Sequence, residues 1–182
     1  RIEVWITNKS GKYDQSRNFV GFMDLAEEGK LANTHWTSNP ALPNPANASN
    51  NLLSTIKTEY PGARNINNVT QVLEPLSAYG IEGGRDYEKV ESARLLSTSE
   101  YTLNATLGYI SLRSALNADE VVAVAYEYTL NGQVYQVGEF SSDITTTDQA
   151  LFLKMLKSTT SSPKLPMWHL MMKNVYSLGG YQ

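Results

Sequence analysis

The sequence contains no cysteine, only two histidines and no long apolar run. The absence of cysteine excludes disulfides, thiol catalysis and thiolate metal ligands together. The longest apolar stretches, VVAVAY and MWHLMM, fall far short of the roughly 20 residues that a membrane-spanning helix needs. A positive charge excess is also lacking, because the formal net charge is −3. We therefore expect a chain that is soluble in itself and that binds no nucleic acid.

Signatures of catalysis are missing as well. The histidines, His35 and His169, lie far apart in the sequence, and no HExxH or similar metal-binding spacing surrounds either of them. Isolated histidines of this kind favour a structural or surface role over that of a ligand or base. No nucleophile motif, phosphate-binding loop or cofactor fingerprint is present. The sequence therefore predicts a protein that is not an enzyme and that holds no metal and no cofactor.

Strand patterns begin at the first residues. The chain has 182 residues, of which 41% are hydrophobic, which fits one domain with an ordinary core. In RIEVWITNKSGKY, Ile2, Val4 and Ile6 share one face with the period of two that a half-buried strand shows. A second strand is expected in FVGFMDL. A chain that opens directly in a strand is interpreted as a piece excised from a larger polypeptide.

The composition changes between residues 26 and 68, where Asn, Pro, Ser and Ala accumulate in NTHWTSNPALPNPANASNN. A long segment of this kind is typical of a functional loop or an insertion. Two short helices are expected near it, one beginning after Asn51 and one after Asn68, with Gly80 closing the second. We therefore predict an Asn/Pro-rich loop-and-helix insertion at about 26–80.

The clearest local pattern is EVVAVAYEYTLNGQVYQVGEF. The dipeptide Asn131-Gly132 between alternating runs predicts a two-residue hairpin, because a type I′ turn needs positive φ at both central residues. This turn pairs Leu130 with Gln133 and Tyr128 with Tyr135. We expect the core to lie on the face that consists of Val122, Val124, Tyr126, Tyr128, Tyr135 and Val137.

The three tyrosines of that face allow two interpretations. Tyr126, Tyr128 and Tyr135 can be cross-strand core contacts, which is the commoner use of paired aromatics on a sheet. They can also form an exposed platform on which a sugar or a peptide stacks. Solvent exposure of all three would favour the platform, and burial would exclude it.

The C-terminal part combines a strand and a helix. LFLKMLK (151–157) predicts a strand, and a helix is expected to begin at Pro166 and to end at Gly179. On this helix Trp168 and Tyr176, if exposed, are candidate contacts with a partner; burial beneath the helix is the alternative. The segment also carries four lysines that we expect to be solvated: Lys154, Lys157, Lys164 and Lys173.

Two acidic groups deserve comparison with known sites. Asp86, Glu88 and Glu91 lie among basic residues, and a hydrolase would need two of these carboxylates in one pocket. Alternating charges more often form a solvated face with local ion pairs. Asp143 and Asp148 stand in SSDITTTDQ, which lacks a calcium-binding pattern and favours a connecting loop.

Long distinctive strings stand at both ends and in the middle of the chain. They are RIEVWITNKSG, NFVGFMDL, LNADEVVAVAYEYTLNGQVYQVGEF and LMMKNVYSLGGYQ. In these strings the chain resembles the SprA/Sov family of Bacteroidota, which acts in gliding motility and type 9 protein secretion. The resemblance is weakest across residues 26–68. It implies a piece of a giant outer-membrane β-barrel, the secretion translocon, with no catalytic residues to transfer.

The sequence and the resemblance together give these expectations. The fold is α+β: an antiparallel, sandwich-like β-sheet with a loop/helix insertion and a C-terminal helix, in a single domain that spans residues 1–182. The function is that of a non-catalytic scaffold, cap or docking domain of the translocon, and the alternative is a cell-surface glycan- or peptide-binding module. Its partners would be the remainder of the parent barrel, other secretion proteins or exported cargo. It would reside in the cell envelope and be associated with the outer membrane only through its parent.

Overall fold

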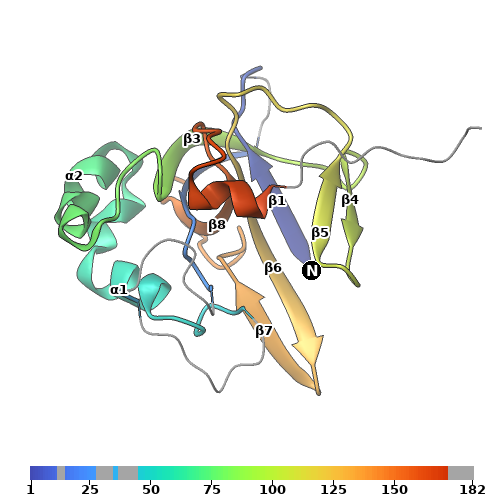
Figure 1. Cartoon of the computed structure of the whole chain (residues 1–182), viewed down its shortest axis with the longest axis horizontal. Helices are drawn as coiled ribbons and strands as arrows, with labels where there is room; N and C mark the ends of the chain where they lie inside the picture. The colour runs from blue at the N-terminus through green and yellow to red at the C-terminus, as the bar shows by residue number, and fades with distance from the viewer. Residues whose placement is uncertain (12–14, 28–34, 37–44, 172–182) are drawn as a thin grey trace, which may run out of the picture.

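The computed structural model describes residues 1–11, 15–27, 35–36 and 45–171, and within them the fold is α+β with a mainly antiparallel sheet (Figure 1). Six strands lie in the order β1–β3–β2–β8–β6–β7, and β1 also pairs with β6. Five of them therefore close into a barrel, and β7 extends beyond it. The bounds are β1 (Ile2–Ile6), β2 (Ser16–Phe22), β3 (Tyr87–Leu95), β6 (Val122–Leu130), β7 (Gln133–Val137) and β8 (Leu151–Lys157).

The closed barrel replaces the sandwich that we expected. A sandwich has two separate sheets, whereas β1 pairs with β3 at one edge and with β6 at the other, which removes the free edges of a sheet. The strands expected in FVGFMDL and LFLKMLK are confirmed as β2 and β8. These two run parallel, with Phe19 opposite Leu151, and the other pairings among the strands described are antiparallel.

The barrel interior is filled from all five strands. Trp5, Phe19 and Met155 pack there against Ala123 and Ala125 of β6. We expected the valine face of β6 to hold the core, and that expectation was incomplete because the alanine face lines the interior. The small side chains of Ala123 and Ala125 leave room for the rings of Trp5 and Phe19.

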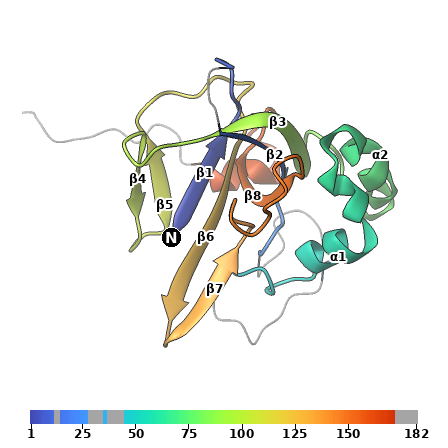
Figure 2. The same cartoon turned by 180° about the vertical axis from the view of Figure 1, so that it is seen from behind.

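Two structures cover the outside of the barrel on opposite sides (Figures 1 and 2). One is the helical layer, residues 52–79, which packs on the outer faces of β2 and β8. The other is the β4–β5 hairpin, formed by β4 (Tyr101–Asn104) and β5 (Tyr109–Leu112), which packs on the valine face of β6.

The helical layer agrees in part with the expected helices. It consists of α1 (Leu52–Glu59), α2 (Val69–Leu73) and the 3₁₀ helices Pro61–Arg64, Ile66–Asn68 and Glu74–Tyr79. α1 begins after Asn51, as expected, but the Asn51 side chain does not cap it. The Asn50 side chain accepts the Leu52 N–H instead, at 3.1 Å. Gly80 closes the last turn with φ of 77°, as predicted.

The β6–β7 hairpin has the expected turn and register. Asn131 and Gly132 have φ of 50° and 78°, which are the positive values of a type I′ turn. Tyr128 faces Tyr135, and Leu130 faces Gln133. The turn lies away from the barrel, so the hairpin projects from the body of the molecule (Figure 1).

The C-terminal helix begins as expected and is shorter within the residues described. Pro166 occupies the first position of a 3₁₀ helix, Pro166–Leu170, in which Met167 is buried. The remainder of the expected helix, with its cap at Gly179, lies outside the described residues. In the part of the chain that the structure describes, no helix has the length and apolar character to cross a membrane.

Candidate functional site

The three tyrosines of the β6–β7 hairpin lie in a row. The ring centroids of Tyr128 and Tyr135 are 5.3 Å apart with the planes at 22°, which is a stacked cross-strand pair. The centroids of Tyr126 and Tyr128 are 6.3 Å apart. Burial raises the pKa of Tyr126 to about 12, and the charge of Glu27 adds to this effect, so the phenol stays protonated at neutral pH.

Neither interpretation of the tyrosines holds for the whole row, because all three side chains are half-buried. Tyr126 packs against the core beneath the helical layer, as a core residue does. Tyr128 and Tyr135 stack on each other nearer to the turn. The row therefore has an inner end, Tyr126, that packs on the core, and an outer end of two stacked rings nearer to the turn.

A short piece of the Asn/Pro-rich segment lies against this hairpin. The Tyr128 hydroxyl donates to the Pro45 carbonyl at 3.0 Å, and the Asn47 N–H donates to the Gln136 carbonyl at 2.7 Å. The Asn47 side chain accepts the Gly138 N–H at 2.7 Å and donates to the Gly138 carbonyl at 3.2 Å. Asn47 thus covers the base of the β7 edge, which no local sequence signal indicated.

The partner contacts expected at the C-terminal end are only partly described. Trp168 is half-buried, and its backbone N–H donates to the Leu165 carbonyl at 3.0 Å. Tyr176 lies outside the described residues. A contact of Trp168 with a partner stays a prediction.

The acidic group on and before β3 does not behave as a solvated face. Asp86 and Glu88 are buried, and only Glu91 is exposed. Asp86 Oδ2 accepts the Glu82 N–H at 2.8 Å and also binds the Arg85 guanidinium. The expectation of a solvated face was wrong for two carboxylates because distant or folded-back chain covers them: Asp86 lies in the turn 82–86 and Glu88 beneath Thr159.

The three carboxylates also have different partners. Glu88 Oε1 accepts the N–H and hydroxyl of Thr159, at 2.8 and 2.5 Å, whereas Glu91 lies 3.9 Å from Lys89. Glu88 therefore ties the chain after β8 to β3. The hydrolase hypothesis needs two converging carboxylates, and none of these contacts joins one of the three to another.

The other candidate residues also have structural contacts. Asp143 Oδ2 accepts the Phe140 N–H at 2.9 Å and the Gln136 side chain at 2.6 Å, so it caps a loop turn. Asp148 is exposed. His35 stacks on an exposed tyrosine of the helical layer with ring centroids 3.9 Å apart. Among the described residues, no group of three or more His, Asp or Glu side chains is arranged to hold a metal ion.

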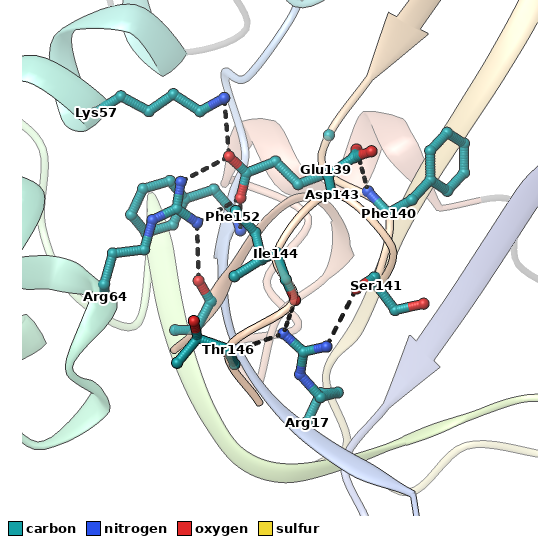
Figure 3. A network of polar contacts seen from close by, with 12 residues as sticks. Arg17, Lys57, Arg64, Glu139, Phe140, Ser141, Asp143, Ile144, Thr146 and Phe152 are labelled. Atoms are coloured by element: carbon teal, nitrogen blue, oxygen red, sulfur yellow. Dashed lines mark hydrogen bonds and ion pairs between the residues drawn. The ribbon is translucent and has the colours of Figure 1, made fainter. Parts of the chain in front are cut away.

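A buried ion-pair network, which the sequence did not indicate, joins the β7–β8 loop (residues 138–150) to the helical layer (Figure 3). The Glu139 side chain is only 3% exposed and binds Arg64 through both oxygens, at 2.5 and 2.7 Å, and Lys57 at 2.9 Å. It also accepts the Phe152 N–H at 2.9 Å. The Arg64 guanidinium lies 3.8 Å from the centre of the Phe152 ring, a cation–π contact.

These contacts hold Glu139 ionised. Burial by itself raises the pKa of Glu139, but the Arg64 guanidinium, the Phe152 N–H and Lys57 outweigh it and hold the pKa below its usual value. The arrangement is a bidentate, charge-assisted ion pair with its remaining acceptor sites used. Its role in the described structure is to lock three elements together.

The same loop is fixed to β2 by Arg17 (Figure 3). The two terminal nitrogens of Arg17 donate to the carbonyls of Ser141, Ile144 and Thr146, at 3.2, 2.8 and 3.4 Å. Arg17 is itself buried. The loop expected in SSDITTTDQ is therefore confirmed as a connection, and it is tied on two sides.

Two lysines that we expected to be solvated are buried. Lys154 and Lys157 are 5% and 9% exposed, whereas Lys164 is exposed as expected and Lys173 lies outside the described residues. The expectation failed because loops distant in the sequence cover both side chains: Met23 and Glu27 contact Lys154, and residues 118–120 contact Lys157. Lys157 donates to three backbone carbonyls, those of Ala118, Glu120 and Ser158, at 3.0, 2.5 and 3.2 Å.

Lys154 is neutralised by an acidic side chain. Its Nζ lies 2.5 Å from Glu27 Oε1 and donates to the Met23 carbonyl. Burial lowers the pKa of Lys154, and the Glu27 carboxylate opposes this shift. Burying two charges has a large desolvation cost, and the contact between Lys154 and Glu27 offsets it.

Comparison with known proteins adds no assignment to this geometry. No protein-family model matches the chain, and no curated protein matches it either.

Proposed function

We propose that this chain is a non-catalytic scaffold, cap or docking domain of an outer-membrane protein-secretion translocon of the type 9 system. Its partners are the remainder of the parent barrel, other secretion proteins or exported cargo. It resides in the cell envelope and reaches the outer membrane through its parent. The translocon assignment rests on the resemblance of the long sequence strings to the SprA/Sov family.

One structural observation supports a role through shape and contact. The buried charges of the described residues bind groups of the chain itself, above all Glu139, which ties the β7–β8 loop to Arg64 and Lys57 of the helical layer. Arg17 fixes the same loop to β2. A domain braced in this way keeps its surface in a fixed geometry, which is what a docking block in a large assembly requires.

The first test is removal of the domain from the parent protein. Residues 1–182 are replaced by a short Gly/Ser linker, and cargo on the cell surface and the amount of assembled barrel are scored separately. We expect export to fall while the barrel still assembles, because the domain has its own core. Normal export after a clean deletion would contradict the scaffold or docking role.

A sharper test uses two single substitutions in the parent. Glu139→Ala removes the carboxylate that locks the helical layer, and Glu82→Gln removes an exposed carboxylate that pairs with Arg85 at 3.3 Å. We expect Glu139→Ala to reduce export and Glu82→Gln to leave it unchanged. Equal export from both variants would show that the rigidity of the domain does not matter for secretion.

A second candidate function is a cell-surface glycan- or peptide-binding module. The observation that favours it is the stacked, half-buried pair Tyr128 and Tyr135 on a hairpin that projects from the barrel (Figure 1). Rings of this kind stack on sugars and on proline-containing peptides alike. Binding to the isolated chain distinguishes this candidate from a purely structural role.

A further inference from the structure

We infer that the turn half of the β6–β7 hairpin binds an extended, proline-containing peptide of a partner protein. The site consists of Tyr128, Tyr135 and the outer backbone edge of β7 at Val134. This inference rests on the second candidate function above and commits it to a peptide. It does not depend on the export role, which the deletion of residues 1–182 tests.

The molecule itself shows how the hairpin holds such a chain. Pro45 presents its carbonyl to the Tyr128 hydroxyl at 3.0 Å, and Asn47 donates its backbone N–H to the Gln136 carbonyl at 2.7 Å. In the first contact a phenol hydroxyl donates to a backbone carbonyl of a proline-containing segment. In the second, a backbone N–H binds the edge of a strand. These are two established ways in which proteins bind extended peptides.

The edge of β7 offers the next position. In a two-residue hairpin, Leu130 and Gln133 exchange hydrogen bonds, so Val134 and Gln136 turn their backbone groups away from β6. Asn47 occupies the carbonyl of Gln136. Within the part of the chain that the structure describes, the outward groups of Val134 have no hydrogen-bond partner, and the residue is 65% exposed.

The chemistry favours a peptide over a sugar. The outward N–H and C=O of Val134 lie two residues before Gln136, where Asn47 binds, and a peptide backbone in extended form has donors and acceptors at that spacing. A proline ring of the peptide packs against the stacked pair of Tyr128 and Tyr135. A proline-containing chain is already extended and loses little entropy on binding. The surface of this hairpin carries no charged side chain between Thr129 and Gln136, which favours an uncharged peptide.

The test is a titration of the whole isotope-labelled chain with a synthetic peptide that has the sequence of residues 40–47, Pro-Ala-Leu-Pro-Asn-Pro-Ala-Asn, blocked at both ends. Backbone amide signals are followed by NMR. We expect the largest shifts at Val134, Tyr135 and Gln136. A peptide with its three prolines replaced by alanine should bind at least about tenfold more weakly, because it loses the preformed extended shape.

Three variants separate the ring from the edge. Tyr135→Ser should weaken binding about tenfold, whereas Tyr135→Phe, which keeps the ring, should bind as the original chain does. Val134→Pro removes the outward N–H at a position on an edge strand, where proline is tolerated, and should weaken binding about fivefold. A dispersed amide spectrum shows that each variant is folded, and Leu107→Ser on the other hairpin serves as the remote control.

Several results would overturn the inference. They are the absence of peptide binding at about millimolar concentration, equal affinity for Tyr135→Ser and the original chain, and shifts confined to another surface. A neutral hexasaccharide that shifts the same amides while the peptide does not would assign the platform to sugars. Because export is not measured here, failure of this site leaves the scaffold proposal standing, and the converse also holds.

Discussion

The helical layer and the β4–β5 hairpin are held on the two sides of the barrel by different kinds of contact. The helical layer packs through a large apolar cluster and is also fixed by the buried Glu139, with Arg64 and Lys57. The β4–β5 hairpin packs through a smaller apolar cluster around Tyr101 and is tied by Glu100, which is half-exposed and binds Arg94 at 2.6 Å. A buried ion pair has strict geometry, whereas a partly exposed one contributes little.

The difference predicts that substitutions on the helical side destabilise the domain more than substitutions on the hairpin side. On the helical side, removal of one charged partner leaves another desolvated. On the hairpin side, Leu103 and Leu107 are 50% and 72% exposed, so substitution of these side chains removes few contacts within the protein. The predictions below follow this contrast from the most costly change to the least costly.

Glu139→Ala should be the most destabilising change. It removes a carboxylate that is only 3% exposed, whereas that of Glu100 is 38% exposed. Breaking a buried pair of this kind costs about 3 kcal/mol. The measurement is the free energy of unfolding in urea. The matched control is Glu100→Gln on the hairpin side, which should cost less than about 1 kcal/mol.

Comparable losses in Glu139→Ala and Glu100→Gln would contradict the contrast between the two faces. Lys57→Met gives a further check. Its side chain is 44% exposed, so we expect a smaller loss than for Glu139→Ala. A loss from Lys57→Met as large as that from Glu139→Ala would show that the lysine is the main partner.

Acid should weaken the helical side through protonation of Glu139. The pKa of Glu139 is lower in the folded state than the unfolded value of about 4.3. The stabilisation is therefore fully present above about pH 4.3 and is lost as the pH falls through the folded pKa. Urea unfolding of the original chain and of Glu139→Gln, measured between about pH 3 and pH 7, should show a shallower acid limb in the variant. If the free energy of unfolding falls equally steeply with acid in both proteins, Glu139 does not contribute to the acid sensitivity.

The β6–β7 hairpin could be predicted because its signals are local. Asn131 and Gly132 accept positive φ, and the alternation on either side of them sets the register. The start of α1 near Asn51 is local in the same way. Features of this kind depend on a few neighbouring residues, so no knowledge of the rest of the fold is needed.

The barrel closure and the buried charges could not be predicted in this way. Trp5 pairs with Leu95 on one side and with Ala123 on the other, and a sequence pattern does not show which distant strands meet. Glu139 and Arg64 are 75 residues apart. Lys154 stands in an apolar strand, where its charge suggested a solvated face, yet Glu27 from another loop neutralises it. Pairing between distant segments decided each of these cases.

Gly138→Ala should be the next most destabilising change. Gly138 has φ of 72°, and an added Cβ would lie 2.9 Å from the Val124 carbonyl oxygen, in the barrel wall. Strain and overlap together should cost about 2–3 kcal/mol. Gly108 of the β4–β5 hairpin has φ of 70° with open space around it, so Gly108→Ala should cost only about 1 kcal/mol. Thermal and urea unfolding compare the two, and equal losses would mean that backbone conformation alone decides.

Leu107→Ser should have the smallest effect. The side chain is 72% exposed at the turn of the β4–β5 hairpin, so its removal should change the free energy of unfolding by less than about 0.5 kcal/mol. Leu112→Ser is the matched control, because Leu112 packs against the core beneath the hairpin and its loss should cost about 2 kcal/mol. A loss above about 1 kcal/mol for Leu107→Ser would mean that this end of the hairpin is packed. The hairpin side would then be held as firmly as the helical side, and the contrast between the two faces would fail.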